Sequence, residues 1–314
     1  MREINKIYNE PCLETLKNMD DKSIDCVITS PPYWQLRDYG YDGQWGLEPT
    51  FQEYLEHLWE MMNEIYRVLK DEGTCWINLG DTYARGSRPK YANHNQTLRN
   101  NSEEIIEPNT KPNYEGLDKC LLLIPHRFAI GCIDRGWIVR NDIIWAKRNG
   151  MPESVTDRFT KKHEYIFLMA KSEKYYFDLD IIREKHKQVS IQRNNYKLSS
   201  YNEENASRNR EMKAGELLNE KGKNPGSVSD FWDITTKGNS SKHYASYNMD
   251  LIKKPILAGC PEGGIIYDPF MGTGTTAIAA INSNRNFIGS EMSEEYIKIC
   301  NNNINPLLQR IKLF

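Results

Sequence analysis

The 314-residue chain lacks several features that would mark a secreted, membrane-bound or zinc-binding protein. It contains seven cysteines but no Cys-x-x-Cys pair, which predicts reduced thiols and no metal site. No apolar run reaches the length of a membrane-spanning helix, and residues 1–6 lack the apolar core of a secretory signal. These absences predict a cytoplasmic protein with no membrane partner.

The chain also lacks an excess of positive charge, because its formal net charge is −2 at pH 7. This balance excludes a uniformly basic nucleic-acid coat, so any contact with a polyanion has to come from local clusters of lysine and arginine. The length allows one large α/β domain with an inserted segment, and it disfavours two independent domains.

One short stretch ends a predicted strand abruptly and offers polar and aromatic groups together. The apolar residues 23–28 run into Thr29-Ser30-Pro31-Pro32-Tyr33-Trp34. The two prolines fix φ and remove two backbone donors, so the strand cannot continue and the carbonyls of Ser30 and Pro31 stay open to a ligand. The stretch predicts a cradle for a planar group that carries N–H donors. An ordinary strand-to-loop exit with packed aromatic rings is the alternative.

Three segments between the motifs differ in pattern. Apolar residues recur at helical spacing over residues 51–70, which predicts an amphipathic helix closed by Asp71-Glu72-Gly73. Residues 39–48 are aromatic and glycine-rich, which is typical of a mobile active-site loop. Residues 83–113 are polar without periodicity and predict a loop that is either functional or disordered.

A basic, polar segment covers residues 183–245 and holds few aliphatic clusters. The residues expected to contact nucleic acid gather at its start and are Lys185, Lys187, Arg193 and Lys197. This composition fits a contact region that orders on binding. A solvated surface insertion is the alternative interpretation.

A glycine loop lies between two further predicted strands. The buried strand 264–268 ends on Asp268, the loop Pro269-Phe270-Met271-Gly272-Thr273-Gly274-Thr275-Thr276 opens a helix, and the next strand ends on Glu291. Strand, glycine loop, helix, strand and acid form the nucleoside-binding half of a doubly wound sheet.

Two kinds of nucleoside fit this pattern. The spacing Gly-x-Gly-x-x-Ala satisfies the dinucleotide fingerprint, so a nicotinamide-dependent dehydrogenase stays open, whereas the missing Gly-Lys-Ser/Thr excludes a P-loop. Asp268, directly before the turn, would repel a pyrophosphate but suits the ammonium group of S-adenosylmethionine. In that interpretation the backbone of residues 272–274 approaches the cofactor closely, and Glu291 binds its ribose hydroxyls.

The two motifs together resemble those of the amino-group DNA methyltransferases. The cradle is similar to the catalytic motif of that family, and residues 268–276 are similar to its cofactor motif. The catalytic motif comes first, as in the β arrangement, which is a circular permutation of the fold. Other stretches that resemble family segments are residues 138–147, 157–160, 163–165 and 243–245.

This resemblance implies a Rossmann-like α/β fold with a doubly wound, mostly parallel sheet and an inserted target-recognition region. The implied organisation is a catalytic half at residues 1–182, a target-recognition insertion at 183–245 and a cofactor-binding half at 246–314. The implied cofactor is S-adenosyl-L-methionine, and the implied substrate is double-stranded DNA. A cognate restriction endonuclease is an expected functional partner, and a monomer or a homodimer is the expected state.

The resemblance also assigns roles to individual residues. Catalytic roles fall to Ser30, Pro31, Pro32 and Tyr33. Cofactor binding falls to Asp268, Pro269, Phe270, Gly272, Thr273, Gly274, Thr275, Glu291 and Glu10. The chain departs from the family at Pro11, where an Asp usually lies near the cofactor adenine, which leaves Glu10 or Asn9 as substitutes. It departs again at Asn248, where the family commonly has Pro, so the shape of the cofactor lid is expected to differ.

The chemistry follows from the target. The exocyclic amino group of a base is a poor nucleophile, because its lone pair is delocalised into the ring. We expect the Ser30 hydroxyl and the Pro31 carbonyl to accept its two N–H bonds, and Tyr33 to stack on a base flipped out of the duplex. Rate then comes from proximity and electrostatic stabilisation, without a covalent intermediate.

Position 30 bears on which base is methylated. Family members with Ser there mostly resemble enzymes that methylate cytosine N4, whereas those with Asp mostly act on adenine N6. The ring nitrogen beside the amino group is more basic in cytosine, so a neutral hydroxyl suffices to support the developing charge. Ser30 therefore favours cytosine N4, with adenine N6 as the alternative.

Other functions stay open on the sequence. A cytosine-C5 methyltransferase needs a Cys nucleophile, and Pro11-Cys12 is a Pro-Cys pair, although Cys12 is better explained as a core residue. An RNA or protein amide methyltransferase shares the need for such a cradle, but a separate RNA- or protein-binding domain is not evident. A non-catalytic DNA-binding regulator would keep the insertion but not both intact motifs.

Overall fold

The computed structural model describes residues 2–84, 117–150, 152–186, 188, 222, 229–235 and 248–311. Within these residues, eight strands join in one sheet in the order β1-β8-β7-β2-β3-β5-β4-β6. The strands are β1 (Lys6–Tyr8), β2 (Ile24–Thr29), β3 (Leu69–Leu79), β4 (Ile138–Ala146), β5 (His163–Ala170), β6 (Phe231–Asp233), β7 (Ile265–Asp268) and β8 (Asn286–Ser290). The helices are α1 (Cys12–Lys17), α2 (Phe51–Val68), α3 (Ile124–Asp134), α5 (Met249–Gly259), α6 (Thr275–Ile281) and α7 (Glu294–Ile311), with a 3₁₀ turn η1 (Asp180–Ile182).

The direction of the strands brings the two sequence motifs to one edge of the sheet. Every neighbouring pair is parallel except β3 with β5 and β5 with β4, so β5 alone of the described strands runs against the rest. The carboxyl ends of β1, β8, β7 and β2 therefore lie together. This arrangement confirms the predicted α/β fold with a mostly parallel sheet, and the antiparallel β5 makes the sheet mixed.

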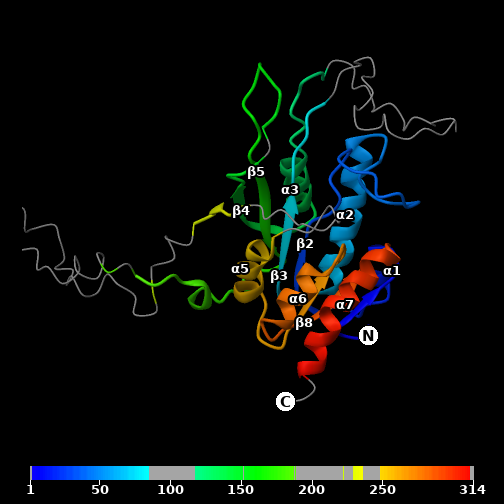
Figure 1. Ribbon diagram of the computed structural model, residues 1–314, viewed down its shortest axis with the longest axis vertical. Coiled ribbons are helices and arrows are strands. Elements are labelled where there is room, and N and C mark those ends of the chain that lie inside the picture. The colour runs from blue at the N-terminus through cyan, green and yellow to red at the C-terminus, as the bar shows by residue number, and fades with distance from the viewer. Residues whose placement is uncertain are drawn as a thin grey trace, which may run out of the picture.

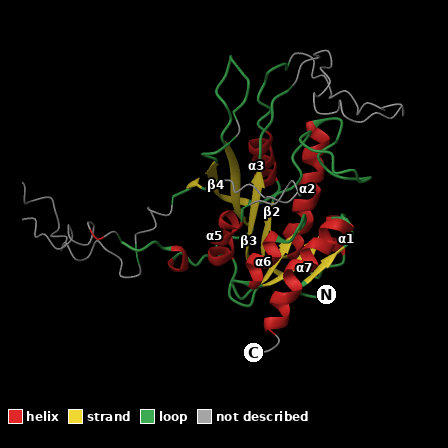
Figure 2. Cartoon of the chain, viewed as in Figure 1, coloured by secondary structure: helices red, strands yellow, loops and turns green. Residues whose placement is uncertain are grey.

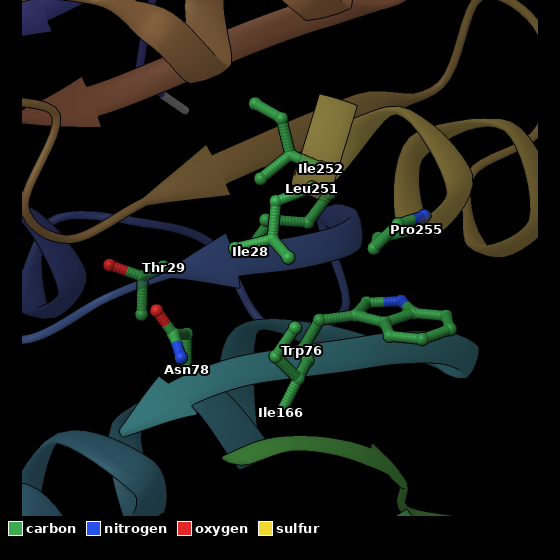
Figure 3. A pocket seen from close by; sticks show the side chains of 8 residues that line it. All are labelled: Ile28, Thr29, Trp76, Asn78, Ile166, Leu251, Ile252 and Pro255. Carbon is green, nitrogen blue, oxygen red and sulfur yellow. The ribbon is translucent and has the colours of Figure 1, made fainter. Parts of the chain in front are cut away.

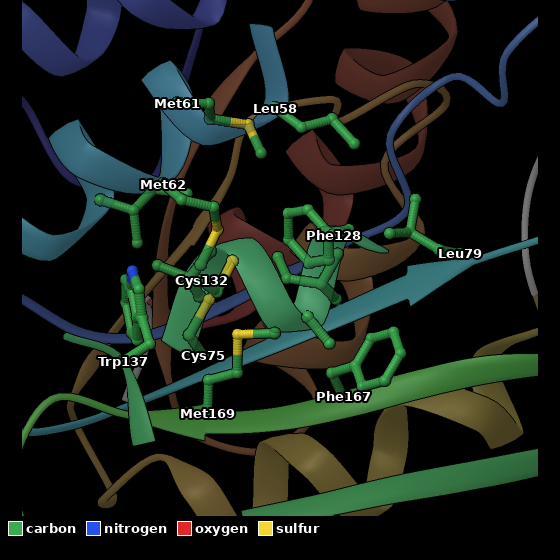
Figure 4. Packing of buried hydrophobic residues seen from close by; sticks show 14 of the residues in the cluster. Leu58, Met61, Met62, Cys75, Leu79, Phe128, Cys132, Trp137, Phe167 and Met169 are labelled. Carbon is green, nitrogen blue, oxygen red and sulfur yellow. The ribbon is translucent and has the colours of Figure 1, made fainter. Parts of the chain in front are cut away.

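Helices cover both faces of the sheet (Figure 1, Figure 2). Val27 of β2 packs into a core with α1, α2 and α3, whereas its neighbours Cys26 and Ile28 pack into a second core with α5, α6 and α7. Figure 4 shows part of the first core, where side chains of α2 and α3 meet those of β3 and β5. A strand that is buried on both faces carries apolar side chains on both, which explains why Cys26, Val27 and Ile28 follow one another without a polar residue between them.

Helix α2 ends at Val68, two residues before the predicted end at residue 70. Leu69 is fully buried and pairs with Ile24 of β2, so it begins β3 instead of continuing the helix. Asp71, Glu72 and Gly73 consequently lie within β3 and do not form the predicted closing turn. The pairing with β2 shifts register after Ile24, which accommodates the extra residues.

Sequence reasoning missed helix α5 and strand β6. Pro255 lies inside α5 and disguises its helical pattern, because proline removes a backbone donor in the helix interior. Pro255 borders a gap of about 10 Å³ against β2, β3 and β5, lined mainly by apolar side chains (Figure 3). Strand β6 falls inside the predicted insertion and pairs with β4 through Trp232 and Trp145. No helix in the described part of the chain is long and apolar enough to cross a membrane.

Candidate active site

A hollow lies at the carboxyl edge of the sheet, where β1, β2, β7 and β8 end. It encloses about 890 Å³ of space, the part open to solvent included. Its predicted lining residues are Glu10, Ser30, Pro32, Pro269, Phe270, Gly272 and Glu291. Its other lining residues are Pro11, Cys12, Leu13, Tyr39, Tyr41, Gly43, Gln44, Trp45, Ser290, Met292 and Tyr296. The catalytic and cofactor motifs therefore contribute to one site, although they lie more than two hundred residues apart in the sequence.

The glycine loop after β7 needs glycine at two positions for different reasons. Gly274 has a φ of +92°, and an added Cβ would lie 2.1 Å from Sγ of Cys300 on α7. Gly272 has a φ of +54° but open space where a Cβ would stand. Gly274 therefore lets the loop pack against α7, whereas Gly272 keeps the wall of the hollow bare beside a ligand.

Asp268 is fully buried and is not among the residues that line the hollow. Its Oδ1 accepts hydrogen bonds from the Thr29 hydroxyl at 2.7 Å and from the Phe270 backbone N–H at 3.0 Å, and its Oδ2 accepts one from the Thr276 hydroxyl at 2.6 Å. These contacts tie the end of β2 to the glycine loop. They favour a structural role for Asp268, and the direct contact with a cofactor ammonium stays a prediction.

Glu291 follows β8 and shapes the opposite wall. Its two carboxylate oxygens accept hydrogen bonds from the backbone N–H groups of Gly272 and Ser293, each at 2.8 Å. Burial raises the pKa of Glu291, and the nearby carboxylate of Asp268 adds to the shift. A carboxylate oxygen has room for further donors, so Glu291 keeps the capacity to accept from a ribose diol.

The structure distinguishes the two candidate substitutes at the start of the chain. The Asn9 side chain donates to the carbonyls of Glu291 and Met292 at 3.0 and 2.9 Å, so it holds the turn after β8. Glu10 lines the hollow, where its carboxylate pairs with Arg2 and accepts from the Thr15 hydroxyl. Glu10 is therefore the better candidate for contact with the adenine.

Part of the aromatic loop at residues 39–48 lines the hollow. The hydroxyl of Tyr41 donates to Ser293 Oγ at 2.6 Å, which fastens the loop to the start of α7. The ring of Trp45 stacks on His57 and meets the edge of Phe270. Aromatic walls of this kind suit the planar face of an adenine.

Asn248 lies where the family commonly has Pro, and it caps α5 by accepting a hydrogen bond from the Asp250 N–H at 3.0 Å.

The cradle after β2 forms a chain of hydrogen bonds. The Ser30 hydroxyl donates to the Tyr33 hydroxyl at 3.4 Å, and the Tyr33 hydroxyl lies 2.8 Å from Oε2 of Glu164. Burial raises the pKa of Tyr33 well above its usual value, and the charge of Glu164 raises it further, so Tyr33 stays a protonated donor. The ring of Tyr33 packs against Gly80, and the Tyr54 hydroxyl donates to the Pro32 carbonyl at 2.8 Å.

Sequence reasoning missed the residues that complete this chain. Glu164 of β5 also pairs with Lys147 after β4. Asn78 of β3 lies 3.1 Å from the Tyr33 hydroxyl and donates to the Tyr165 carbonyl at 3.1 Å. Asn78 is a polar residue within an apolar strand, and this signal could have identified it, because buried polar residues need partners. The Lys147–Glu164 pairing depends on the β4–β5 register and had no local signal.

Cys12 lines the hollow but does not suit nucleophilic catalysis. Burial raises the pKa of its thiol to about 12, so the thiol stays protonated near neutral pH. The thiolate is the nucleophilic form of cysteine. This finding supports the interpretation of Cys12 as a core residue.

Most of the predicted DNA-contact residues lie outside the described part of the chain. Lys185 is exposed shortly after η1. Three of the predicted contacts fall outside the described residues, namely Lys187, Arg193 and Lys197, as do residues 243–245 and almost all of the predicted loop 83–113.

Five of the predicted catalytic and cofactor residues do not line the hollow, although they are sequence neighbours of residues that do. They are Pro31, Tyr33, Thr273, Gly274 and Thr275.

Glu291 gives the first testable prediction. We expect Glu291→Ala to weaken S-adenosylmethionine binding by about 1–3 kcal/mol, because ribose hydroxyls and two backbone donors lose their acceptor. Isothermal titration calorimetry with the purified protein measures the effect. Glu294→Ala is the matched control, since Glu294 is exposed on α7 and lies 3.8 Å from the exposed Lys298. Equal affinities for the two variants would contradict the assignment to the ribose.

The raised pKa of Glu291 predicts a pH dependence of the same binding. The protonated carboxyl loses an acceptor, so affinity for the cofactor falls as the pH drops through the raised pKa. In the Glu291→Ala protein this part of the pH profile should be flat. A profile that is identical in both proteins would place the titrating group elsewhere.

Comparison with known proteins places the chain in a family. Residues 24–302 match the N6/N4 methyltransferase family model, whose description is "DNA methylase". The type II methyltransferase M.Cfr9I of Citrobacter freundii is 35% identical over 300 residues, which cover 95% of this chain and 87% of the relative. The type II methyltransferase M.SmaI of Serratia marcescens is 34% identical over 95% of this chain and 90% of its own length.

Solved structures with lower identity share the fold. The PvuII DNA methyltransferase, named as cytosine-N4-specific, superposes with a TM-score of 0.60 at 16% identity, over 99% of this chain and 93% of its own. The M1.HpyAVI–SAM complex gives a TM-score of 0.54 at 18% identity, over 96% of this chain and 98% of its own. The family model spans most of the sequence, and the curated relatives match nearly end to end. The chain therefore belongs to the family of N6/N4 DNA methylases.

Proposed function

We propose that this DNA methylase transfers the methyl group of S-adenosyl-L-methionine to the exocyclic N4 of a cytosine that is flipped out of double-stranded DNA. The observation that carries the proposal is the position of Ser30. Its side chain belongs to the catalytic motif, yet it lines the same hollow as Glu10, Gly272 and Glu291. A base held at Ser30 would therefore present its amino group to a cofactor held by the other three residues.

The lining of the hollow fits the proposed cofactor. Glu291 and Glu10 offer carboxylate oxygens to hydroxyl and amino donors, and Phe270 and Trp45 offer aromatic walls to an adenine. When bound, S-adenosylmethionine supplies a methyl group activated by a positively charged sulfur. The lining residues hold and orient it, and Tyr41 and Trp45 of the loop at residues 39–48 form part of the wall around it.

The cradle residues prepare the amino group for attack. The Ser30 proton is engaged by Tyr33, so the lone pairs of Ser30 Oγ are left for an N–H of the base. The charge of Glu164 polarises Tyr33, and hydrogen bonds in such a chain strengthen one another. A neutral serine thereby becomes a stronger acceptor. With the Pro31 carbonyl as the second acceptor, the amino nitrogen of the base is held with its lone pair directed toward the methyl group of the cofactor.

The preference for cytosine rests on this neutral acceptor. An adenine amino group needs more support for its developing charge, which a carboxylate at position 30 would supply. The structural likeness to a cytosine-N4-specific methyltransferase is compatible with the preference. The type II relatives support the proposal that this enzyme acts at a specific DNA sequence. We also propose a cognate restriction endonuclease as its functional partner, and phosphate contacts by Lys185, Lys187, Arg193 and Lys197.

Sequencing of DNA from cells that express the protein tests the proposed function. We expect modified cytosines at one short recurring sequence, and none in cells that carry the empty vector. Single-molecule sequencing detects both the sequence and the modified position. Modified adenines at the recurring sequence would show that the target is adenine N6 and not cytosine N4. Unmodified DNA would overturn the whole proposal.

A further inference from the structure

The connection between β4 and β5 carries the most exposed large apolar side chain in the described part of the chain. Phe159 is 96% exposed. The connection runs from residue 147 to residue 162, and Figure 1 shows it as a green arm that rises beyond the ends of the strands. A single exposed apolar residue is ordinary on a protein surface. Its surroundings decide whether Phe159 has a partner.

The arm around Phe159 is braced. The Arg158 guanidinium pairs with Glu153 at 2.5 Å and lies 3.9 Å above the ring of Tyr83. Asp157 pairs with Lys119 at 2.5 Å. The residues directly before Phe159 therefore contact the paired segments at Tyr83 and Lys119, which lie outside the arm. A braced arm presents its tip at a lower cost in conformational entropy than a loose loop.

The charge around the tip favours a polyanion. Three cations and two carboxylates lie at or beside it, and these are Lys119, Arg158 and Lys162 with Glu153 and Asp157. Lys119 and Arg158 pair with the two carboxylates, which leaves the exposed Lys162 as the excess positive charge. The tip therefore combines an apolar ring with a small positive excess, which suits contact with a nucleic-acid backbone.

The arm stands next to the cradle. The ammonium of Lys161, two residues after Phe159, donates to the main-chain oxygen of Asp81. Asp81 follows Gly80, and an added Cβ on Gly80 would lie 2.5 Å from the ring of Tyr33. The base of the arm is thus fixed to the segment that supports the cradle, and a duplex delivering a base to Ser30 would pass the tip.

We propose that Phe159 is a wedge that enters the DNA duplex beside the flipped base and fills the space that the base leaves. This inference rests on the proposed function, because it needs a base to be extruded. Apolar side chains inserted between base pairs stabilise locally unstacked DNA. The braced arm and the excess positive charge beside its tip hold the ring at the duplex while Ser30, Pro31 and Tyr33 receive the base.

Two DNA substrates separate a wedge from other roles. Both contain the sequence found by the sequencing experiment, one fully paired and one with an abasic site opposite the target base. We expect Phe159→Ala to lower kcat/KM on the paired duplex about tenfold or more, because unstacking is no longer stabilised. On the abasic duplex, where the target is already unpaired, the same variant should act within about threefold of the wild-type chain. Phe159→Leu, which keeps an apolar tip, should retain most activity on both substrates.

Ile133→Ala is the matched control. Ile133 is 53% exposed in the last turn of α3, away from the carboxyl edge of the sheet, and should leave both rates unchanged. Equal losses for Phe159→Ala on the two duplexes would overturn the wedge. A lower unfolding midpoint would instead show that the ring packs within the protein, and a change of mass in solution would show contact with a second copy. A wild-type chain that methylates no DNA would refute the proposed function itself.

Discussion

Ser30→Ala should lower kcat for methyl transfer by about 10²–10³-fold, which is typical of removing one group that stabilises developing charge. The variant loses the acceptor for an N–H bond of the base, so the amino nitrogen is no longer held toward the cofactor. Cofactor affinity should stay within about threefold, because the substitution removes a single hydroxyl from the lining of the hollow. Transfer of labelled methyl groups to DNA and calorimetry with the cofactor measure the two effects.

Two more variants test whether the cradle works as a chain. Tyr33→Phe keeps the ring but removes the hydroxyl that lies between Ser30 and Glu164, and Glu164→Gln removes the charge that polarises it. Each should lower kcat by about tenfold, and the double variant should lose little more than either alone, since both break the same chain. Strictly additive losses, or an unchanged kcat in Glu164→Gln, would show that Glu164 does not act through Tyr33.

Asp268→Ala should lower the free energy of unfolding by about 3–5 kcal/mol, one of the largest effects expected of a single substitution in this protein. It would leave the buried hydroxyls of Thr29 and Thr276 and the N–H of Phe270 without their shared acceptor. Each buried donor that loses its partner costs about 1–3 kcal/mol. Equilibrium unfolding in urea measures the change.

Asp268→Asn separates the structural role from a cofactor contact. Asparagine keeps one acceptor oxygen and the side-chain shape, so it should cost less stability than alanine. If Asp268 acts only by holding the glycine loop, the variant that loses more stability should also lose more affinity for the cofactor. A variant that stays as stable as the wild-type chain but no longer binds S-adenosylmethionine would instead support the predicted direct contact between Asp268 and the cofactor ammonium.

The sequence predicts both motifs and their placement at strand ends because those features are local. Two prolines stop a strand wherever it lies, and a glycine loop between two apolar runs indicates a turn before a helix. The parallel sheet then brings Ser30 and Glu291 to one edge, which explains why the shared hollow was within reach of sequence reasoning.

The sequence does not reveal the direction in which a buried polar side chain points. Asp268 meets Thr29 across 239 positions and Tyr33 meets Glu164 across 131, and neither partner is marked locally. The same limit explains the missed helix α5, in which Pro255 contradicts a helical pattern that tertiary packing stabilises. Residues 157–160 resemble a family segment, but the sequence does not show that Phe159 is exposed at the tip of the connection between β4 and β5.

One measurement tests most directly whether the hollow and the cradle methylate cytosine together. The purified protein is incubated with S-adenosylmethionine and a duplex that contains the recognised sequence, and the DNA is digested to nucleosides for mass spectrometry. We predict N4-methyldeoxycytidine as the product, and its loss in the Ser30→Ala protein. N6-methyldeoxyadenosine as the only methylated nucleoside, or an equal yield from the Ser30→Ala protein, would contradict the assignment.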